Sequence, residues 1–114
     1  MSPTQKTLEW CRKQNFSVQT VEKWNRFAKR RIDLFGCIDL VYLTGIDGSG
    51  VYGVQCCITG DISKRREKIL TVYAGFNDLR NWFRSGNTLE IHGWAKRGAR
   101  GKRKLWTLRV VESK

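Results

Sequence analysis

Apolar residues recur at two different spacings along the chain, and each spacing predicts a different kind of element. Helical spacing occurs over residues 7–15 and again over residues 17–29, where Trp24 and Phe27 would lie on one face of a helix capped by Ser17. We therefore expect two helices near the start of the chain, with apolar faces that cover a sheet.

The pattern then changes to one typical of strands. Branched and aromatic residues dominate residues 32–43, and Gly36 interrupts them, which predicts two short strands or one bulged strand. A glycine-rich turn over residues 45–50 follows, and alternating apolar positions occupy residues 51–59. We expect an antiparallel hairpin joined by this turn.

The rest of the chain predicts helices followed by strands. Asp61 can cap a helix over residues 62–74, and a short helix is expected over residues 78–84. Two last strands, over residues 89–94 and 105–111, flank a basic loop.

The order is therefore α-β-β-β-α-β-β, which predicts an α/β fold with a central mixed β-sheet flanked by helices. A chain of 114 residues can bury one hydrophobic core but not two, and neither a repeat nor a linker interrupts it. We expect one nucleic-acid-binding domain over residues 1–114.

Charge indicates the class of partner. Lys and Arg number 22 against 10 Asp and Glu, for a formal net charge of +12. Such an excess favours a polyanion, because cations that neutralise phosphates release condensed counterions. Nucleic acid is the expected partner, with DNA favoured over RNA. A membrane is not expected, since no run of about 18 apolar residues is present. The first residues lack the apolar stretch of a secretory signal, so we expect a cytoplasmic protein.

The cysteines and the histidine predict structural roles. The four cysteines include no Cys-x-x-Cys pair, and His92 lies far from them in sequence, so a zinc site is not expected. Adjacent Cys56 and Cys57 would point to opposite faces of a strand and stay reduced. We expect the cysteines, His92 and most of the five tryptophans to pack in the core.

Acidic residues concentrate where basic residues are missing. Residues 32–63 contain four aspartates and no Lys or Arg. Carboxylates repel phosphates but bind Mg²⁺, which takes oxygen ligands. Asp39 and Gln55 are expected on neighbouring strands, with Gln55 facing away from the tighter apolar row. The alternative is that Asp33 and Asp39 lie at strand ends or on a solvated face.

Three segments around these acids carry a family resemblance. EKWN (residues 22–25), RIDLFGCIDL (31–40) and VQCCIT (54–59), with the order of the elements, resemble the PD-(D/E)XK nuclease superfamily and its small phage and archaeal Holliday-junction-resolvase-like members. The resemblance implies a restriction-endonuclease-like fold and a Mg²⁺- or Mn²⁺-dependent endonuclease.

The resemblance also implies roles for individual residues. Glu22 matches the family's helical acid, Asp39 its central metal-binding aspartate, and Gln55 and Cys57 the acid and lysine of its E-x-K pair. The last two depart from the family, because Gln is a weaker ligand than a carboxylate and Cys supplies no ammonium. Asp33 is a reserve metal ligand.

Some members of the superfamily carry the lysine on the following helix, and Lys64 or Lys68 is the candidate here. Because they are four residues apart, both can lie on one helix face. The alternative is that they form a solvated basic face or contact phosphates.

Basic residues outside the acidic segment are the expected nucleic-acid contacts. Residues 96–104 contain six cations and two glycines, which suits a phosphate-binding loop, although a merely solvated hairpin tip has the same composition. The expected contacts are Arg30, Arg31, Arg65, Lys96, Arg97, Arg100, Lys102, Arg103 and Lys104.

Three functions follow from these features. The favoured one is a Mg²⁺-dependent endodeoxyribonuclease, acting on DNA that includes branched forms such as Holliday junctions. The alternative is a nuclease fold that binds DNA or RNA without cleaving it. A third is a small basic structural protein of a ribonucleoprotein or virion. A homodimer is compatible with all three.

Overall fold

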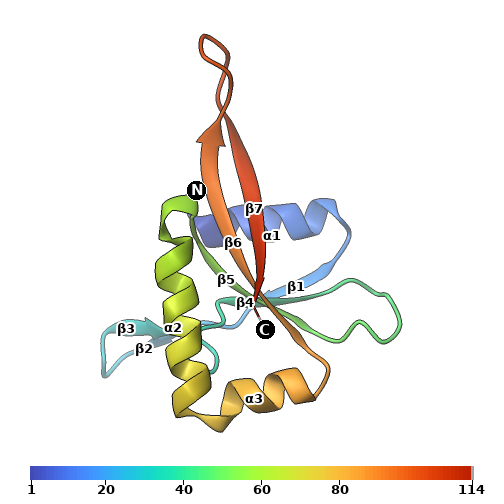
Figure 1. Ribbon diagram of the computed structural model, residues 1–114, viewed down its shortest axis with the longest axis vertical. Helices are drawn as coiled ribbons and strands as arrows, with labels where there is room; N and C mark the ends of the chain where they lie inside the picture. The colour runs from blue at the N-terminus through green and yellow to red at the C-terminus, as the bar shows by residue number, and fades with distance from the viewer. Residues whose placement is uncertain (114) are drawn as a thin grey trace.

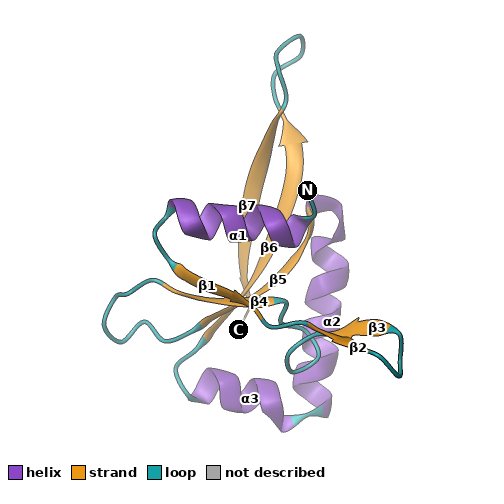
Figure 2. Cartoon of the chain, turned by 180° about the vertical axis from the view of Figure 1, so that it is seen from behind, coloured by secondary structure: helices purple, strands orange, loops and turns teal. Residues whose placement is uncertain are grey.

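A five-stranded mixed sheet forms the centre of the molecule, with helices on both faces (Figures 1 and 2). The computed structural model describes residues 1–113. The strands lie in the order β1-β4-β5-β6-β7, and only β5 and β6 run parallel. Their bounds are β1 (Ser17–Thr20), β4 (Leu40–Leu43), β5 (Tyr52–Ile58), β6 (Thr88–Arg97) and β7 (Leu105–Ser113). The predicted α/β class with a central mixed sheet is confirmed.

Helix α1 (Pro3–Lys13) covers one face of the sheet, and begins earlier than predicted because of its cap. The Ser2 hydroxyl accepts a hydrogen bond from the backbone N–H of Gln5, and the Gln5 side chain accepts one from the backbone N–H of Ser2. This capping box satisfies two amides that the first turn leaves unpaired.

The opposite face is covered by α2 (Ile62–Gly75) and α3 (Asn77–Arg84), which lie close to the predicted ranges. They form the crossover that makes β5 and β6 parallel. Asp61 does not cap α2 with its side chain as predicted, because a short 3₁₀ turn, η1 (Thr59–Asp61), leads into the helix.

Alternating residues of β5 divide the core into two parts. Val54 and Cys56 face α1, whereas Cys57 packs on the other side with Ile62 and Ile69 of α2. Each buried aliphatic side chain of this kind stabilises the fold by about 1.5–3 kcal/mol. The prediction that Cys56 and Cys57 point to opposite faces is confirmed, and all four cysteines are buried and free.

The helix predicted over residues 17–29 is wrong. These residues form β1, which pairs with β4, and then β2 (Lys23–Asn25), which pairs with β3 (Arg30–Ile32). The Asn25 side chain closes the tip of this hairpin by accepting hydrogen bonds from the amides of Phe27 and Ala28.

The apolar residues that suggested this helix do not share a buried face. Trp24 is 62% and Phe27 is 98% exposed. Pairing with β4 therefore outweighs the helical spacing, because a helix of this length without a packed face is only marginally stable in water. Residues 23–32, which comprise β2, its turn and β3, form the basic arm of the protein.

The segment after the basic arm also differs from expectation. Residues 33–39 are mostly a tight loop, closed by a bridge between Leu34 and Ile38 and turned by Phe35 and Gly36 at φ values of 51° and 79°. The hairpin of β4 and β5 is confirmed, with Leu40 opposite Val54. Among residues 1–113, no helix has the length and apolar character needed to cross a membrane.

Candidate metal centre

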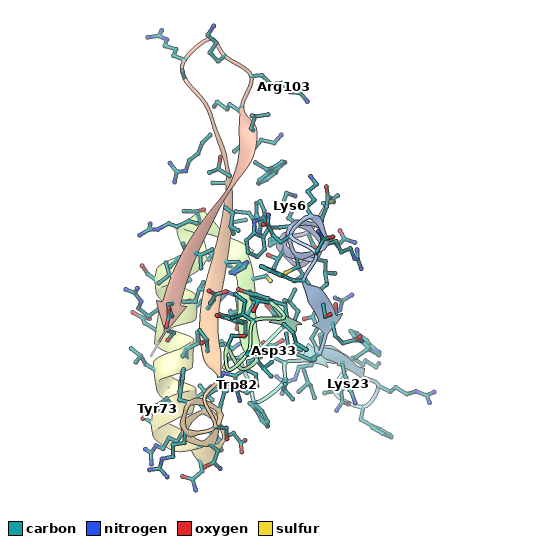
Figure 3. The ribbon with its side chains drawn as sticks, turned by 90° about the vertical axis from the view of Figure 1, so that its right-hand side faces the viewer. Lys6, Lys23, Asp33, Tyr73, Trp82 and Arg103 are labelled. Carbon is teal, nitrogen blue, oxygen red and sulfur yellow. The ribbon has the colours of Figure 1, made fainter. Side chains whose placement is uncertain are left out.

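Three carboxylates converge beside the start of β4. Glu22 precedes β2, Asp33 follows β3, and Asp39 immediately precedes β4. One carboxylate oxygen from each residue lies within 4.8 Å of those from the other two. Figure 3 shows Asp33 near the middle of the molecule, at the base of the segment that carries Lys23.

Strand pairing explains why residues so distant in sequence meet. Lys23 pairs with Ile32, so Glu22 and Asp33 are the next two positions at the base of the same hairpin. The amides of Val21 and Glu22 donate to the carbonyl oxygen of Asp39 over 2.9 Å and 3.3 Å. These hydrogen bonds hold the base of the basic arm against the start of β4.

Asp39 is the buried member of the cluster, at 5% exposure. Its Oδ2 accepts hydrogen bonds from Gln55 Nε2 at 2.9 Å and from the backbone N–H of Cys56 at 2.8 Å. Burial, together with the charges of Asp33 and Glu22, raises the pKa of Asp39 to about 7, although the Cys56 amide acts in the opposite direction. A proton therefore stabilises this carboxyl group near neutral pH, and a bound cation would do the same.

Gln55 provides a second unusual feature. Its side chain is 2% exposed, and its Oε1 is a buried oxygen without a hydrogen-bond partner among the described residues. An unsatisfied buried acceptor of this kind destabilises a fold by about 1–3 kcal/mol. The structure thus brings the side chains of Asp39 and Gln55 together, as expected, and leaves a carbonyl oxygen beside the carboxylates.

Two cations pair with the outer carboxylates. Lys68 Nζ of α2 lies 2.9 Å from Asp33 Oδ2, and Arg31 Nη1 lies 3.0 Å from Glu22 Oε1. Lys64 is exposed on α2, and no described contact joins it to the cluster. Of the two candidate lysines, Lys68 is therefore the one at the site.

Glu22 and Cys57 do not occupy the positions that the resemblance suggested. Glu22 lies between two strands rather than on a helix, because the predicted helix over residues 17–29 is absent. Cys57 is 3% exposed and packs in the core under α2. Burial raises the pKa of its thiol, so it supplies neither a cation nor a thiolate ligand near neutral pH.

The expected nucleic-acid contacts fall into separate regions. Arg30 and Arg31 are exposed on the basic arm, beside the carboxylates, and Arg65 is half-buried on α2. The remaining six cations, in residues 96–104, lie at the outer end of the β6–β7 hairpin. Figure 3 shows Arg103 at the far end of the molecule from Asp33. The basic loop therefore does not cover the cluster.

A hollow that sequence reasoning missed lies beside the basic arm. A cavity of about 430 Å³ lies there, and its lining includes Asp33, Lys23, Trp24 and Phe35. This segment was predicted to be a helix, so the cavity was not expected. The only sequence signals against that helix were the β-branched Val18 and the turn-forming Asn25, which favour strands.

The buried polar network around His92 has a structural role, as predicted. His92 is fully buried, with Nε2 3.0 Å from Glu90 Oε1 and Nδ1 3.4 Å from Thr7 Oγ1. Tyr42 donates to the same Glu90 oxygen over 2.6 Å. Burial raises the pKa of Glu90, but the hydrogen bonds from His92 and Tyr42 outweigh it and hold the pKa below its usual value.

Comparison of the chain with protein-family models, with curated proteins and with solved structures finds no match.

Proposed function

We propose that this protein is a metal-dependent endonuclease that cleaves phosphodiester bonds in DNA. The observation that carries the proposal is the meeting of Glu22, Asp33 and Asp39 within 4.8 Å in a chain of net charge +12. The buried, unpartnered Oε1 of Gln55, whose amide contacts Asp39, is the independent support.

The donor set suits Mg²⁺ or Mn²⁺. Both ions prefer carboxylate and carbonyl oxygens. The cluster supplies three carboxylates, and rotation of the Gln55 amide, whose Nε2 now donates to Asp39, would add its unpartnered Oε1. Burial of Asp39 and, to a smaller extent, repulsion by Asp33 and Glu22 raise its pKa, and a bound cation would offset both effects. Glu22, Asp33, Asp39 and Gln55 would hold the ion.

A bound divalent cation supplies a more acidic water molecule and stabilises negative charge on a phosphate. Lys68 is placed to assist this cleavage. A metal ion held by Asp33 would compete with the Lys68 ammonium group for the same carboxylate oxygen and would free the ammonium group. Lys68 could then orient the attacking water or bind a phosphate oxygen, and Arg31 could do the same from the side of Glu22. Lys68 is preferred to Lys64 for this role.

The topology supports a restriction-endonuclease-like assignment. Leaving out the basic arm, the order of elements is α1, three antiparallel strands, helices α2 and α3, and the strands β6 and β7. Asp39 lies immediately before β4 and contacts Gln55 of the neighbouring strand β5, as the resemblance to PD-(D/E)XK nucleases implies.

The basic arm favours a nucleic-acid substrate at this site. Residues 23–32 contain five cations and no acid, and the arm starts and ends at Glu22 and Asp33. Because its cations lie next to the carboxylates, a phosphate backbone bound by the arm would pass the candidate metal centre.

The proposal is tested by nicking of supercoiled plasmid and of a synthetic four-way junction in Mg²⁺, Mn²⁺ or EDTA. Wild type should cleave only with metal, and Asp39→Asn should lose at least about 100-fold in rate, as expected when a metal ligand is removed. Asp47→Asn, which neutralises an exposed loop carboxylate, is the matched control and should cleave normally. Cleavage by Asp39→Asn at the wild-type rate, or no cleavage with either metal, would contradict the proposal.

A second candidate is a nuclease-like fold that binds nucleic acid without cleaving it. The replacement of an acid and a lysine by Gln55 and Cys57, together with the burial of Cys57, favours it. It predicts metal-independent binding that weakens steeply with salt and is reduced by alanine at Lys102 and Arg103. Asp39→Asn would leave that binding unchanged.

A further inference from the structure

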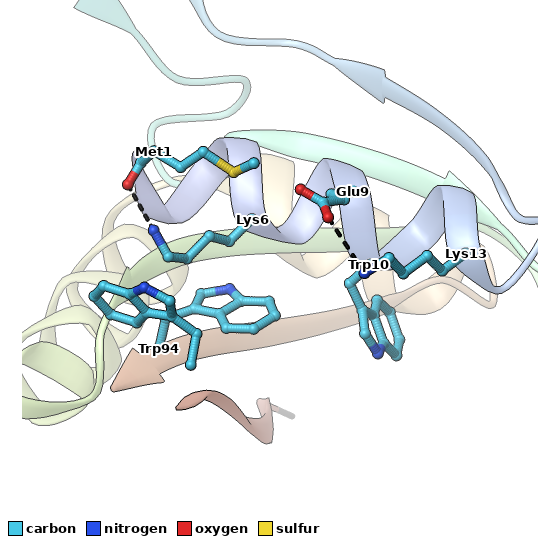
Figure 4. A pocket seen from close by; sticks show the side chains of 7 residues that line it. Met1, Lys6, Glu9, Trp10, Lys13 and Trp94 are labelled. Atoms are coloured by element: carbon cyan, nitrogen blue, oxygen red, sulfur yellow. Dashed lines mark hydrogen bonds and ion pairs between the residues drawn. The ribbon is translucent and has the colours of Figure 1, made fainter. Parts of the chain in front are cut away.

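A groove lined by tryptophans lies on the α1 side of the sheet, apart from the carboxylates. It has a volume of about 540 Å³ and is bounded by α1 and the β6–β7 hairpin (Figure 4). Trp10 of α1, Trp94 of β6 and Trp106 of β7 all line it. The prediction that most tryptophans are core residues is wrong, because of the five only Trp82 and Trp94 are buried, whereas Trp24 is 62% and Trp106 is 47% exposed.

The structure holds the indole rings in place. The Trp94 N–H donates to Thr7 Oγ1 over 2.9 Å, and Trp94 is only 8% exposed. Trp10 packs edge-on against Tyr42 and His92, with ring centroids 6.1 Å and 5.4 Å away. The groove therefore has a fixed aromatic wall before any ligand binds, which lowers the entropy lost on binding.

Two ammonium groups lie over the ring of Trp106, the most exposed of the three tryptophans that line the groove. Lys6 Nζ is 4.0 Å and Lys96 Nζ is 5.4 Å from the centroid of the Trp106 ring. Lys6 is 9% exposed and also donates to the carbonyl oxygen of Met1 over 2.6 Å. Lys13 lies at the other end of the groove, 3.2 Å from Glu9. A ligand in the groove would meet flat aromatic faces and positive charge together.

We propose that this groove binds an unpaired nucleobase together with its phosphate. A base presents two flat faces for stacking only when it is not enclosed in a duplex, and bases stack on aromatic side chains in single-stranded nucleic acids. The exposed Lys96 lies where it can meet the attached phosphate, and the buried Lys6 adds positive charge beside the Trp106 ring. Charge complementarity thus favours a nucleotide over an uncharged aromatic group of a protein partner.

The position of the groove extends the proposed function. The other five cations of the basic loop, in residues 97–104, lie beyond one end of the groove, and in Figure 3 Lys6 lies between Arg103 and Asp33 along the long axis. A strand bound by both the basic tip and the metal centre would pass the groove. The inference rests on the proposed function for its choice of nucleic acid, and it specifies a substrate with a single-stranded segment.

The test measures binding in EDTA, where metal-dependent cleavage is suppressed. The probes are a fluorescein-labelled 15-nucleotide oligo(dT), an abasic strand of the same length and a 15-base-pair duplex, each followed by anisotropy. Wild type should bind oligo(dT) more tightly than the abasic strand. Trp106→Ala should weaken oligo(dT) binding by about 5- to 100-fold, the range of one lost stacking contact.

Leu105→Ala is the matched control, because Leu105 is the neighbouring residue of β7 and is 61% exposed. It should change oligo(dT) affinity less than twofold, and Trp106→Phe should keep most of the wild-type affinity. The inference is overturned if Trp106→Ala binds oligo(dT) as Leu105→Ala does, or if the wild type binds the abasic strand equally well. Equal loss of oligo(dT) affinity in the two variants would show a contact other than base stacking and would also overturn the inference.

Failure here is distinguishable from failure of the proposed function. Metal-dependent nicking that requires Asp39, with no effect of Trp106→Ala on oligo(dT) affinity, would remove only the groove. Loss of oligo(dT) affinity in Trp106→Ala, with no nicking in either metal, would support the groove and refute the nuclease.

Discussion

Replacing Asp39 by Asn should stabilise the metal-free protein at alkaline pH while removing its response to metal. The Asn side-chain oxygen can still accept the hydrogen bonds that Gln55 and Cys56 donate to Asp39 Oδ2. Its amide nitrogen would face Asp33 and Glu22 and donate to them. The substitution therefore keeps the packing and removes a buried negative charge.

The magnitude follows from the pKa of Asp39, which folding raises from 3.8 to about 7. Between these values the folded state keeps a proton that the unfolded state has lost. The free energy of unfolding of the wild type, without metal, therefore falls as the pH rises from about 4 and levels off above about 7. About three pH units at 1.36 kcal/mol each give about 4 kcal/mol as an upper value, and structural relaxation reduces it to about 2–4 kcal/mol.

Urea unfolding followed by tryptophan fluorescence in EDTA measures this difference. At pH 5 the variant should be more stable than the wild type by about 1–1.5 kcal/mol, and at pH 8 this difference should grow to about 2–4 kcal/mol. Asp47→Asn is the control and should follow the wild type at both pH values. Saturating Mg²⁺ at pH 8 should stabilise only proteins that retain Asp39, by about 2.7 kcal/mol at a concentration of 100 times Kd.

Two results would refute this reasoning. A variant less stable than the wild type at pH 8 would mean that the charge of Asp39 is already compensated. A difference that does not change between pH 5 and pH 8 would mean that Asp39 keeps an ordinary pKa in the folded protein.

Three further predictions test the core and the cluster. Gly93→Ala should destabilise the fold by about 1–3 kcal/mol in urea unfolding, since an added Cβ would lie 2.6 Å from Ile62 Cδ1, and an unchanged midpoint would contradict this packing. Gln55→Glu replaces the hydrogen-bond donor to Asp39 by a carboxylate, so it should lower metal-free stability at pH 8 by about 1–3 kcal/mol and tighten Mg²⁺ binding in calorimetry. Weaker Mg²⁺ binding would place Gln55 outside the set of metal ligands. The four buried thiols should react with Ellman's reagent at pH 8 only after unfolding, because burial raises their pKa values, to about 12 for Cys37. Rapid reaction of the native protein would contradict their burial.

Elements with strong local signals were predicted from the sequence. The hairpin of β4 and β5 follows from its turn, in which Gly45, Gly48 and Gly50 adopt positive φ values of 84°, 75° and 72°. Helix α2 matches the predicted range 62–74 to within one residue, and Gly75 is its last residue. In these segments the local preference and the tertiary structure agree, so pattern alone is sufficient.

The segment after Ser17 shows where local pattern fails. The spacing of Val18, Trp24 and Phe27 fits a helix, yet Val18 lies in β1, Trp24 in β2 and Phe27 in a turn, because β4 offers β1 a pairing partner about 20 residues away. Hydrogen bonds to a remote strand carry no local signature, so helical periodicity was the stronger signal in the sequence.

The candidate site divides in the same way. Residue type, the absence of Lys and Arg from residues 32–63, and strand alternation were sufficient to predict contact between Asp39 and Gln55. The convergence of Glu22 and Asp33 on them, and the choice of Lys68 rather than Lys64, depend on the basic arm and on the packing of α2. Strand register and helix packing set the distances between residues remote in sequence, and they also place the basic loop far from the carboxylates. The sequence by itself determined which charges and ligand atoms the protein carries, and the tertiary structure alone decided which of them meet.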